Sequence, residues 1–251
     1  GEPLGSSDSE ECRIDALAQA WSVLSGAASP ERARQAMEEV EARLISEPDR
    51  IIRLLHPPFD RTAQDPGYIK GYAPGVRENG GQYTHAALWV VQALARLGKR
   101  DRCARLLRML TPVAHTATRE DVERYRVEPY VVAADVYGAV PYVGRGGWTW
   151  YTGSAGWMYR AILESLLGLT LHAGEAVRLQ PGIPDDWPSF EIQYKTPRGS
   201  VLRIAATRGA PAGSAVREAR IDGAPLPVED GAVLIPFGDR GKRYDVRVVL
   251  G

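Results

Sequence analysis

The stretch YTHAALWVVQALARL, residues 83–97, carries apolar side chains at helical spacing. They are Tyr83, Ala87, Val90, Val91, Leu94 and Leu97. Side chains spaced in this way share one face of an α-helix, so the stretch predicts a helix that buries that face against a core. A second stripe of the same kind, over residues 14–24, predicts another helix facing the core.

Four more helices are predicted in the first part of the chain. One covers residues 30–44 and has Pro30 at an early position, where a missing N–H is tolerated. The others cover residues 101–110, 129–137 and 155–169. The chain up to residue 173 is therefore expected to be helical.

After Gly174 the pattern changes to short alternating runs, at residues 190–194, 201–204, 219–221, 233–235 and 244–249. Turn-forming residues separate them at 197–199, 222–223 and 238–239. This pattern predicts an antiparallel β-sandwich over residues 174–251. The chain is thus expected to combine a helical domain, residues 1–173, with a β domain, residues 174–251.

The charge balance excludes several function classes. Thirty-one Lys and Arg residues match 31 Asp and Glu residues, and a chain of zero formal charge is not expected to bind nucleic acid or an anionic membrane surface. The sequence lacks an apolar run long enough to span a bilayer. Cys12 and Cys103 have no neighbours at metal-ligand spacing, so no metal site is predicted and a reducing cytoplasm is the expected compartment.

Polar and aromatic residues gather in GYIKGYAPGVRENGGQYTH, residues 67–85. Arg77, Glu78, Gln82 and His85 lie within nine residues, and Tyr83 offers a flat ring face on which a sugar could stack. This mixture suits a polyhydroxylated ligand. The alternative is a Gly-rich helix entrance in which Glu78 pairs with Arg77 and His85 is a satisfied, half-buried residue.

A second cluster is GRGGWTWYTGSAGWMYR, residues 144–160. A helix is expected to begin near Thr152, with the N–H groups of Gly153 and Ser154 pointing outward from its positive end. Such an end binds anions. The alternative is a Thr or Ser side chain that caps the helix, with the tryptophans filling a core.

Glu128 precedes Pro129 at the start of the helix predicted over residues 129–137. Its carboxylate could compensate the helix dipole or bind a sugar, and the sequence leaves both open. Nucleotide-binding glycine patterns, the serine-hydrolase elbow and the zinc-protease motif are absent.

Three segments in order, residues 67–85, 127–137 and 144–160, resemble glycoside hydrolase family 94. Within this family, their sequences most resemble the C-terminal phosphorylase region of cyclic β-1,2-glucan synthases. The resemblance implies the second half of an (α/α)6 barrel followed by a jelly-roll β-sandwich. It also implies an inverting phosphorylase, which cleaves a β-glucosidic bond with inorganic phosphate and releases α-glucose 1-phosphate.

The resemblance implies a role for each matching residue. His85, Thr152, Gly153 and Ser154 fall at the phosphate site, and Arg77, Glu78, Gln82, Tyr83 and Glu128 fall at the sugar site. Arg77 stands where cellobiose phosphorylases have lysine, and Ala134 stands where they have a substrate-binding glutamine. Cellobiose is therefore not the expected substrate.

The family's general acid belongs to an Asp-Trp-Asn-Asp-like motif, which the resemblance places upstream of residue 1. The catalytic acid is thus unknown within this chain, which is expected to be inactive alone. Phosphate is the expected co-substrate, no cofactor is implied, and the expected partners are a β-glucan and the rest of the barrel. A homodimer and a soluble part of an inner-membrane protein are left open, as is a non-catalytic glucan-binding or chain-length-sensing module.

Overall fold

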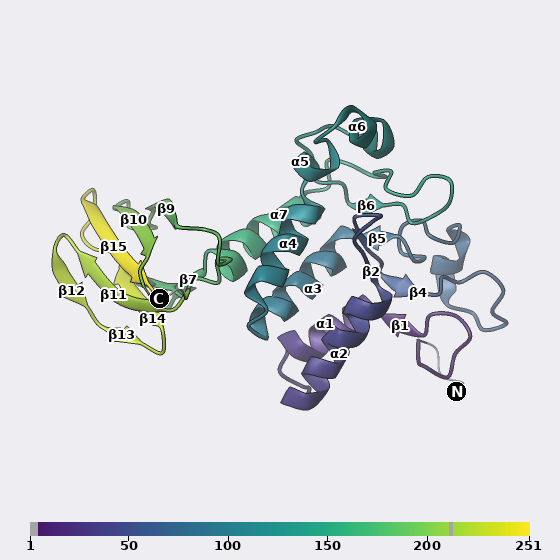
Figure 1. Cartoon of the computed structure of the whole chain (residues 1–251), viewed down its shortest axis with the longest axis horizontal. Helices are drawn as coiled ribbons and strands as arrows, with labels where there is room; N and C mark the ends of the chain where they lie inside the picture. Colours follow the sequence, from purple (N-terminus) through teal and green to yellow (C-terminus); the bar gives the residue numbers. More distant parts are fainter. Residues whose placement is uncertain (1–4, 211–212) are drawn as a thin grey trace. The chain divides into compact units, whose positions relative to one another are not determined.

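The computed structural model describes residues 5–210 and 213–251 and divides into two compact units, Gly1–Ala161 and Ile162–Gly251. Figure 1 shows helices and short strands in the first unit and β-sheets in the second. The chain is therefore mixed α and β, with its helices first. The predicted domain assignment, 1–173 and 174–251, stays a prediction.

The first unit contains seven α-helices in its described residues. They are α1 Ala16–Leu24, α2 Pro30–Arg43, α3 Thr84–Arg96, α4 Arg100–Leu110, α5 Pro112–His115, α6 Arg119–Tyr125 and α7 Thr152–Arg160. A short 3-10 helix, η1, covers Gly67–Gly71. The helices predicted over 14–24, 30–44, 83–97 and 101–110 are confirmed, whereas α5 and α6 were not predicted.

Helix α3 is the centre of the first unit. It packs against α1, α2, α4 and α7, and nine of its thirteen residues are buried (Figure 1). Side-chain caps fix where its neighbours begin: Asp15 accepts hydrogen bonds from the amides of Leu17 and Ala18, and Ser29 caps α2 ahead of Pro30. The stripe that the sequence shows over residues 83–97 therefore becomes the buried core.

Short antiparallel strand pairs connect the helices. β1 (Ile14–Asp15) pairs with β4 (Leu55–His56), β2 (Ile45–Ser46) with β3 (Ile51–Ile52), and β5 (Gln82–Tyr83) with β6 (Asp135–Val136). The helix predicted over 129–137 is wrong, because β6 is extended there. Its neighbour Ala134 accepts a hydrogen bond from the Thr84 amide, so this backbone pairs across the unit rather than along a helix.

The segment at residues 152–169 also differs from its prediction. Helix α7 begins at Thr152, and a π-helical turn, η2, covers Ala161–Leu166. Strand β7 already starts at Leu169, so the helical segment begins and ends about three residues earlier than the predicted range of 155–169. The N-cap position is Tyr151, without a side-chain capping bond, so the alternative of a Thr or Ser cap is wrong.

The second unit has two sheets. One is five-stranded, in the order β12-β11-β15-β10-β9, and the other is four-stranded, in the order β13-β14-β8-β7. The strands are β7 Leu169–His172, β8 Ala176–Leu179, β9 Ser189–Lys195, β10 Val201–Arg208, β11 Val216–Ile221, β12 Ala224–Leu226, β13 Val228–Glu229, β14 Ala232–Pro236 and β15 Arg243–Leu250. The five predicted strands are confirmed as β9, β10, β11, β14 and β15.

Both sheets bury side chains in one core, which includes Val177 and Val233 from the smaller sheet and Leu202 and Val246 from the larger. The prediction of purely antiparallel pairing is wrong at one place, since β10 and β15 are parallel over their whole length. Parallel neighbours need a long crossover, and here the chain passes through β11 to β14 between them.

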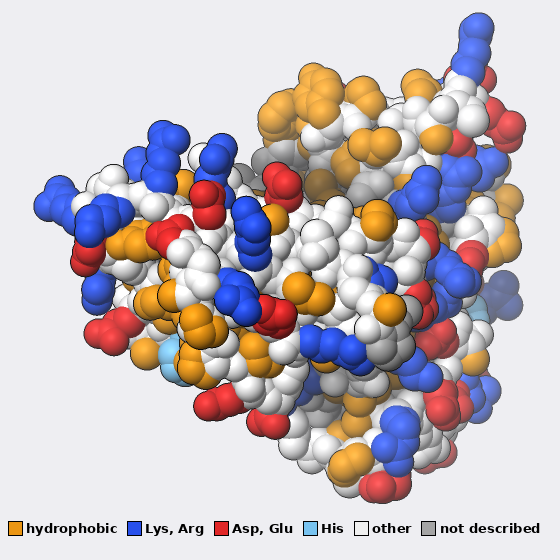
Figure 2. Space-filling model, turned by 60° about the vertical axis from the view of Figure 1, so that its left-hand side comes forward, with side chains coloured by type: hydrophobic (Ala, Val, Ile, Leu, Met, Phe, Trp, Pro, Cys, Tyr) orange, Lys and Arg blue, Asp and Glu red, His pale blue; other side chains and the backbone are white. Residues whose placement is uncertain are grey.

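Basic and acidic side chains are interspersed over the face shown in Figure 2, as the equal counts of the two signs suggest. No helix in the described residues is long and apolar enough to cross a membrane. Both cysteines are free and buried, and burial raises the pKa of the Cys103 thiol to about 12.

Candidate functional site

The first predicted cluster is built around the junction of β5 and α3. Tyr83 lies opposite Asp135 in the β5–β6 pair, and the Thr84 hydroxyl donates to the Ala133 carbonyl at 2.7 Å. His85 follows as the second residue of α3, and its ring stacks on Tyr83 with centroids 5.3 Å apart. Pairing of β5 with β6 therefore helps to orient the His85 side chain at the start of α3.

The N-terminus of α7 meets this histidine. A methyl group added at Gly153 would overlap Nε2 of His85, so the imidazole lies directly against the first turn of α7. Trp89 of α3 packs against His85 and against Trp157 of α7, with ring centroids 6.3 Å and 5.4 Å apart. The structure thus brings His85 and Gly153 together, although 68 positions separate them in the sequence.

The first turn of α7 keeps its amide groups available. Thr152 is exposed, and no side chain caps the helix at Tyr151. Ser154 is buried, and its hydroxyl donates to the Tyr151 carbonyl at 3.1 Å, so it does not occupy the N–H groups of this turn. Uncapped amides at the positive end of a helix are suited to an anion.

His85 is polar but not satisfied. Its Nδ1 atom is buried without a hydrogen-bond partner, which contradicts the alternative of a satisfied histidine. Burial lowers the pKa of His85, so the neutral imidazole dominates at neutral pH. A neutral imidazole can still donate one hydrogen bond, and an anion beside it would raise its pKa.

Arg77 and Glu78 form the second part of the site. Arg77 Nε lies 3.5 Å from Glu78 Oε2, and their side chains are only 19% and 16% exposed. The guanidinium stacks on Trp148, 4.3 Å from the ring centroid, and on Tyr72 at 5.2 Å. The pairing of Arg77 with Glu78 that the sequence left open is therefore present, within an aromatic setting.

Asp135 is a residue that sequence reasoning missed. It is 1% exposed, and its Oδ1 accepts the Trp148 amide at 2.9 Å while Oδ2 is buried without a partner. Burial raises the pKa of this carboxyl, while Arg77 lowers it and Glu78 raises it. Gly147 has no room for a side chain because a methyl group would overlap the carboxylate. The only sequence signal was an acidic residue among apolar ones at 131–136.

Other predicted residues lie differently. Gln82 is buried, and its amide accepts from the Ile52 N–H at 3.0 Å and donates to Thr84. Glu128 accepts a hydrogen bond from the Trp150 indole at 3.0 Å. The segment that follows it, residues 129–137, is not helical, so Glu128 does not face a helix N-terminus. The structure therefore shows Gln82 engaged with backbone and Glu128 engaged with an exposed tryptophan.

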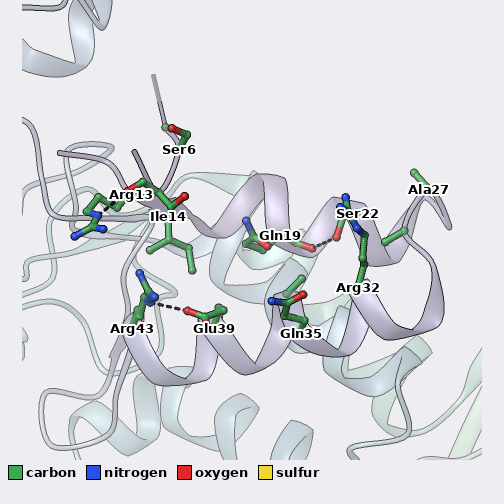
Figure 3. Close-up of a pocket in the computed structure, with 14 residues that line it drawn as sticks. Ser6, Arg13, Ile14, Gln19, Ser22, Ala27, Arg32, Gln35, Glu39 and Arg43 are labelled. Carbon is green, nitrogen blue, oxygen red and sulfur yellow. Dashed lines mark hydrogen bonds and ion pairs between the residues drawn. The ribbon is translucent and has the colours of Figure 1, made fainter. Parts of the chain in front are cut away.

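A separate cavity of about 680 Å3 lies between α1 and α2, and Figure 3 shows the two helices with the side chains that line it. Arg13, Arg32 and Arg43 contribute to its lining, and Arg43 is paired with Glu39. None of the predicted site residues lines this cavity. Within residues 5–210 and 213–251, no group of three or more His, Cys, Asp or Glu side chains could hold a metal ion.

Comparison with known proteins gives several relatives. The chain is 51% identical to the cyclic β-(1,2)-glucan synthase NdvB of Rhizobium meliloti over 214 residues, which are 85% of this chain and 8% of that protein. It is 30% identical to the N,N'-diacetylchitobiose phosphorylase of Vibrio proteolyticus, over 100% of this chain and 30% of that protein. It is 29% identical to the solabiose phosphorylase of Paenibacillus borealis, over 99% of this chain and 31% of that protein.

The chain thus spans less than a third of the length of these relatives. Residues 1–168 match the family model described as the glycosyl hydrolase 94 superfamily, catalytic domain. This match covers the segments that carry His85, Gly153, Arg77 and Glu78. The chain therefore belongs to the glycosyl hydrolase 94 family.

Proposed function

We propose that this chain forms part of an inverting β-glucan phosphorylase, which contributes the phosphate site and part of the sugar site. The observation that carries the proposal is the position of His85 against Gly153 at the uncapped N-terminus of α7. A helix terminus attracts an anion, and a neighbouring imidazole adds a hydrogen bond to it. The proposed anion is inorganic phosphate, because two of the relatives are phosphorylases and phosphate is the co-substrate of such enzymes.

In the proposed reaction, a phosphate oxygen attacks the anomeric carbon of a β-glucoside from the face opposite the leaving group. The new C1–O bond has the α configuration, and the old C1–O bond breaks. One carboxylic acid gives its proton to the leaving oxygen, as in inverting hydrolysis, and phosphate replaces the activated water. Because phosphate is already anionic, no protein base is needed.

The acid itself is proposed to lie in a segment upstream of residue 1. Residues 1–173 would then supply half of an (α/α)6 barrel, and residues 174–251 a jelly-roll sandwich. The helix pairs around α3 and the common core of the two β-sheets support this assignment. A cytoplasmic location is proposed as well, consistent with two free, buried thiols.

The sugar contacts are proposed to come from Arg77, Glu78 and Tyr83. The ion pair of Arg77 and Glu78 is partly buried beside Trp148, so its polar groups can bind hydroxyl groups while the aromatic ring packs on a pyranose face. Burial raises the pKa of Tyr83, and the negative charge of Glu78 raises it further. Thr152, Gly153 and Ser154 are proposed to bind phosphate together with His85.

The substrate is proposed to be β-1,2-linked glucan. The support is the 51% identity to a cyclic β-(1,2)-glucan synthase, which exceeds the 29% and 30% identities to the two disaccharide phosphorylases. A planar, bidentate arginine at residue 77 would bind a sugar differently from the point charge of a lysine.

A non-catalytic glucan-binding module is the second candidate. The exposed aromatic side chains at residues 148 and 150 favour it, because exposed aromatic patches mark binding surfaces. The two candidates differ in their dependence on phosphate. A binding module would hold glucan equally with and without phosphate and would release no product.

The test is glucose 1-phosphate release from linear β-1,2-glucan and phosphate. The 251-residue chain is compared with a version extended upstream to include the acid motif. Product from the extended version alone supports the proposal. Product from neither version, with glucan binding retained, would favour the binding module, and product from the 251-residue chain would refute the placement of the acid.

A further inference from the structure

Two large aromatic side chains outside the proposed phosphate and sugar contacts stand in solvent. Tyr130 is 74% exposed and Trp150 is 68% exposed, and their ring centroids lie 6.3 Å apart at 67°. Both belong to the first unit. We call this pair, together with Glu128, the outer aromatic site.

The outer aromatic site is held in place rather than left free. The Trp150 indole donates to Glu128 Oε1 at 3.0 Å, so the carboxylate fixes one edge of the ring and leaves its faces open. Trp150 also has a positive φ of 62°, which a bulky residue rarely adopts. Surrounding structure must maintain such a conformation, and outliers of this kind concentrate where a ligand is bound.

Exposed apolar side chains are informative where they form a patch, and here two large aromatic rings lie together. A flat aromatic face next to a carboxylate acceptor matches a pyranose ring. Its axial C–H bonds pack on the ring face, and its hydroxyl groups donate to the carboxylate.

Two further aromatic residues, Trp148 and Tyr151, lie within two positions of Trp150 in the sequence. Tyr151 follows Trp150 directly, and its ring lies 5.4 Å from that of Trp148. Trp148 in turn carries the Arg77 guanidinium at 4.3 Å. Trp148 and Tyr151 are 49% and 45% exposed, so this pair also presents aromatic surface to solvent, next to Arg77.

We propose that the outer aromatic site binds a glucose unit of a longer β-glucan chain, remote from the bond that is cleaved. The proposal rests on the proposed function for its ligand class, a β-linked glucan. It adds that the protein distinguishes long chains from short ones. Glu128 is then a positioning residue for Trp150 as well as an acceptor for hydroxyl groups.

The experiment measures binding of two β-1,2-linked probes, the disaccharide and a longer linear oligosaccharide, to the 251-residue chain by calorimetry without phosphate. The variants are Trp150→Ala, Tyr130→Ala and, as a control, Tyr159→Ala. Tyr159 lies in α7 and, like Trp150, is 68% exposed, so its removal changes a similar surface elsewhere. Far-UV circular dichroism confirms that each variant keeps its helices and sheets.

We expect the wild-type chain to bind the longer probe more tightly than the disaccharide. Trp150→Ala and Tyr130→Ala should each weaken binding of the longer probe about 3- to 10-fold, while disaccharide binding and Tyr159→Ala stay at wild-type values. Equal affinities of the wild type for both probes, or an unchanged affinity in Trp150→Ala, would overturn the proposal. A change of oligomeric state in Trp150→Ala without a change in binding would overturn it too and would assign the site to a protein contact.

Failure of the proposed function would look different. Glucose 1-phosphate release from the disaccharide and phosphate affinity are measured separately, and neither depends on Trp150 in this account. A chain that prefers the longer probe through Trp150 but supports no phosphorolysis in its extended form would retain the outer aromatic site and refute the phosphorylase.

Discussion

Replacing Gly153 with alanine tests the proposed phosphate site where the N-terminus of α7 contacts His85 of α3. The new methyl group would overlap Nε2 of His85, so the imidazole would have to turn away from α7. Tyr83 and Trp89 pack on the same ring, which limits the positions that it can take. The amides of α7 would stay in place, whereas the histidine would lose its reach to an anion at the helix terminus.

The size of the effect follows from the lost hydrogen bond. A hydrogen bond to a charged group contributes about 1.5–3 kcal/mol, which corresponds to a loss of roughly 10- to 150-fold in phosphate affinity. The helix terminus keeps its own attraction for the anion, about 0.3–1 kcal/mol. Some phosphate binding should therefore persist in Gly153→Ala.

Gly156→Ala is the matched control. It lies on the same helix, and a methyl group there would meet no atom within 4 Å. Both substitutions replace helical glycine with alanine, which favours the helix by up to about 1 kcal/mol. Gly156→Ala should thus be slightly more stable than the wild type and bind phosphate equally well.

The assay is calorimetric titration of each protein with inorganic phosphate, with urea unfolding to compare stability. The reasoning predicts a weakened site in Gly153→Ala and an unchanged site in Gly156→Ala. If Gly153→Ala bound phosphate as tightly as the wild type, His85 would not contact the anion, and the assignment of this site would be wrong.

Three further predictions concern other parts of the first unit. Glu78→Gln should weaken β-1,2-glucan binding about 5- to 50-fold through a lost charge-assisted hydrogen bond but leave phosphate affinity unchanged; equal glucan affinity in calorimetry would remove Glu78 from the site. Burial lowers the pKa of His115 to about 4 from an ordinary 6.5, so the unfolded state binds the extra proton and the free energy of unfolding should fall by up to about 3 kcal/mol between pH 6.5 and pH 4. Urea unfolding should show a smaller fall in His115→Phe, and an identical pH profile would refute this origin. Asn79→Ala should cost about 3 kcal/mol, since its buried amide makes three hydrogen bonds to Phe59 and Tyr72; a loss below about 1 kcal/mol in the same assay would contradict that role.

Much of the helical unit was predictable because its signals are local. The stripe over residues 83–97 and the proline at residue 30 act within one or two helical turns, and α3 and α2 form where they indicate. The glycines beside Thr152 likewise predicted a helix start with open amides. The alternative, a Ser or Thr side chain that caps the helix, is absent because the helix begins at Thr152 itself.

Long-range pairing explains the failures. Residues 129–137 have the apolar content of a short helix, but β6 is held extended by β5, about fifty residues earlier in the chain. This pairing also buries Asp135 beside Tyr83 and Trp148. A lone aspartate within an expected helix carried no sign of these partners, so its place in the site could not be predicted.

The same limit applies to the site. The adjacency of Arg77 and Glu78 could be anticipated from the chain, but the ring of Trp148 on the guanidinium joins segments seventy residues apart. Gln82 stays a predicted sugar contact; its side chain is buried and accepts a hydrogen bond from the Ile52 amide, a long-range contact that the local sequence does not indicate. Local patterns therefore indicate which segments matter, and tertiary pairing decides which side chains face the ligand.

The most direct test of the account is a phosphate titration followed by the amide signals of α7 and the ring signals of His85 in nuclear magnetic resonance. The account predicts that the largest shifts occur at the amides of Gly153 and Ser154, together with a rise in the pKa of His85 as phosphate binds. Saturable shifts at another place, or none at Gly153 and His85, would contradict the claim that the N-terminus of α7 and this histidine form the phosphate site.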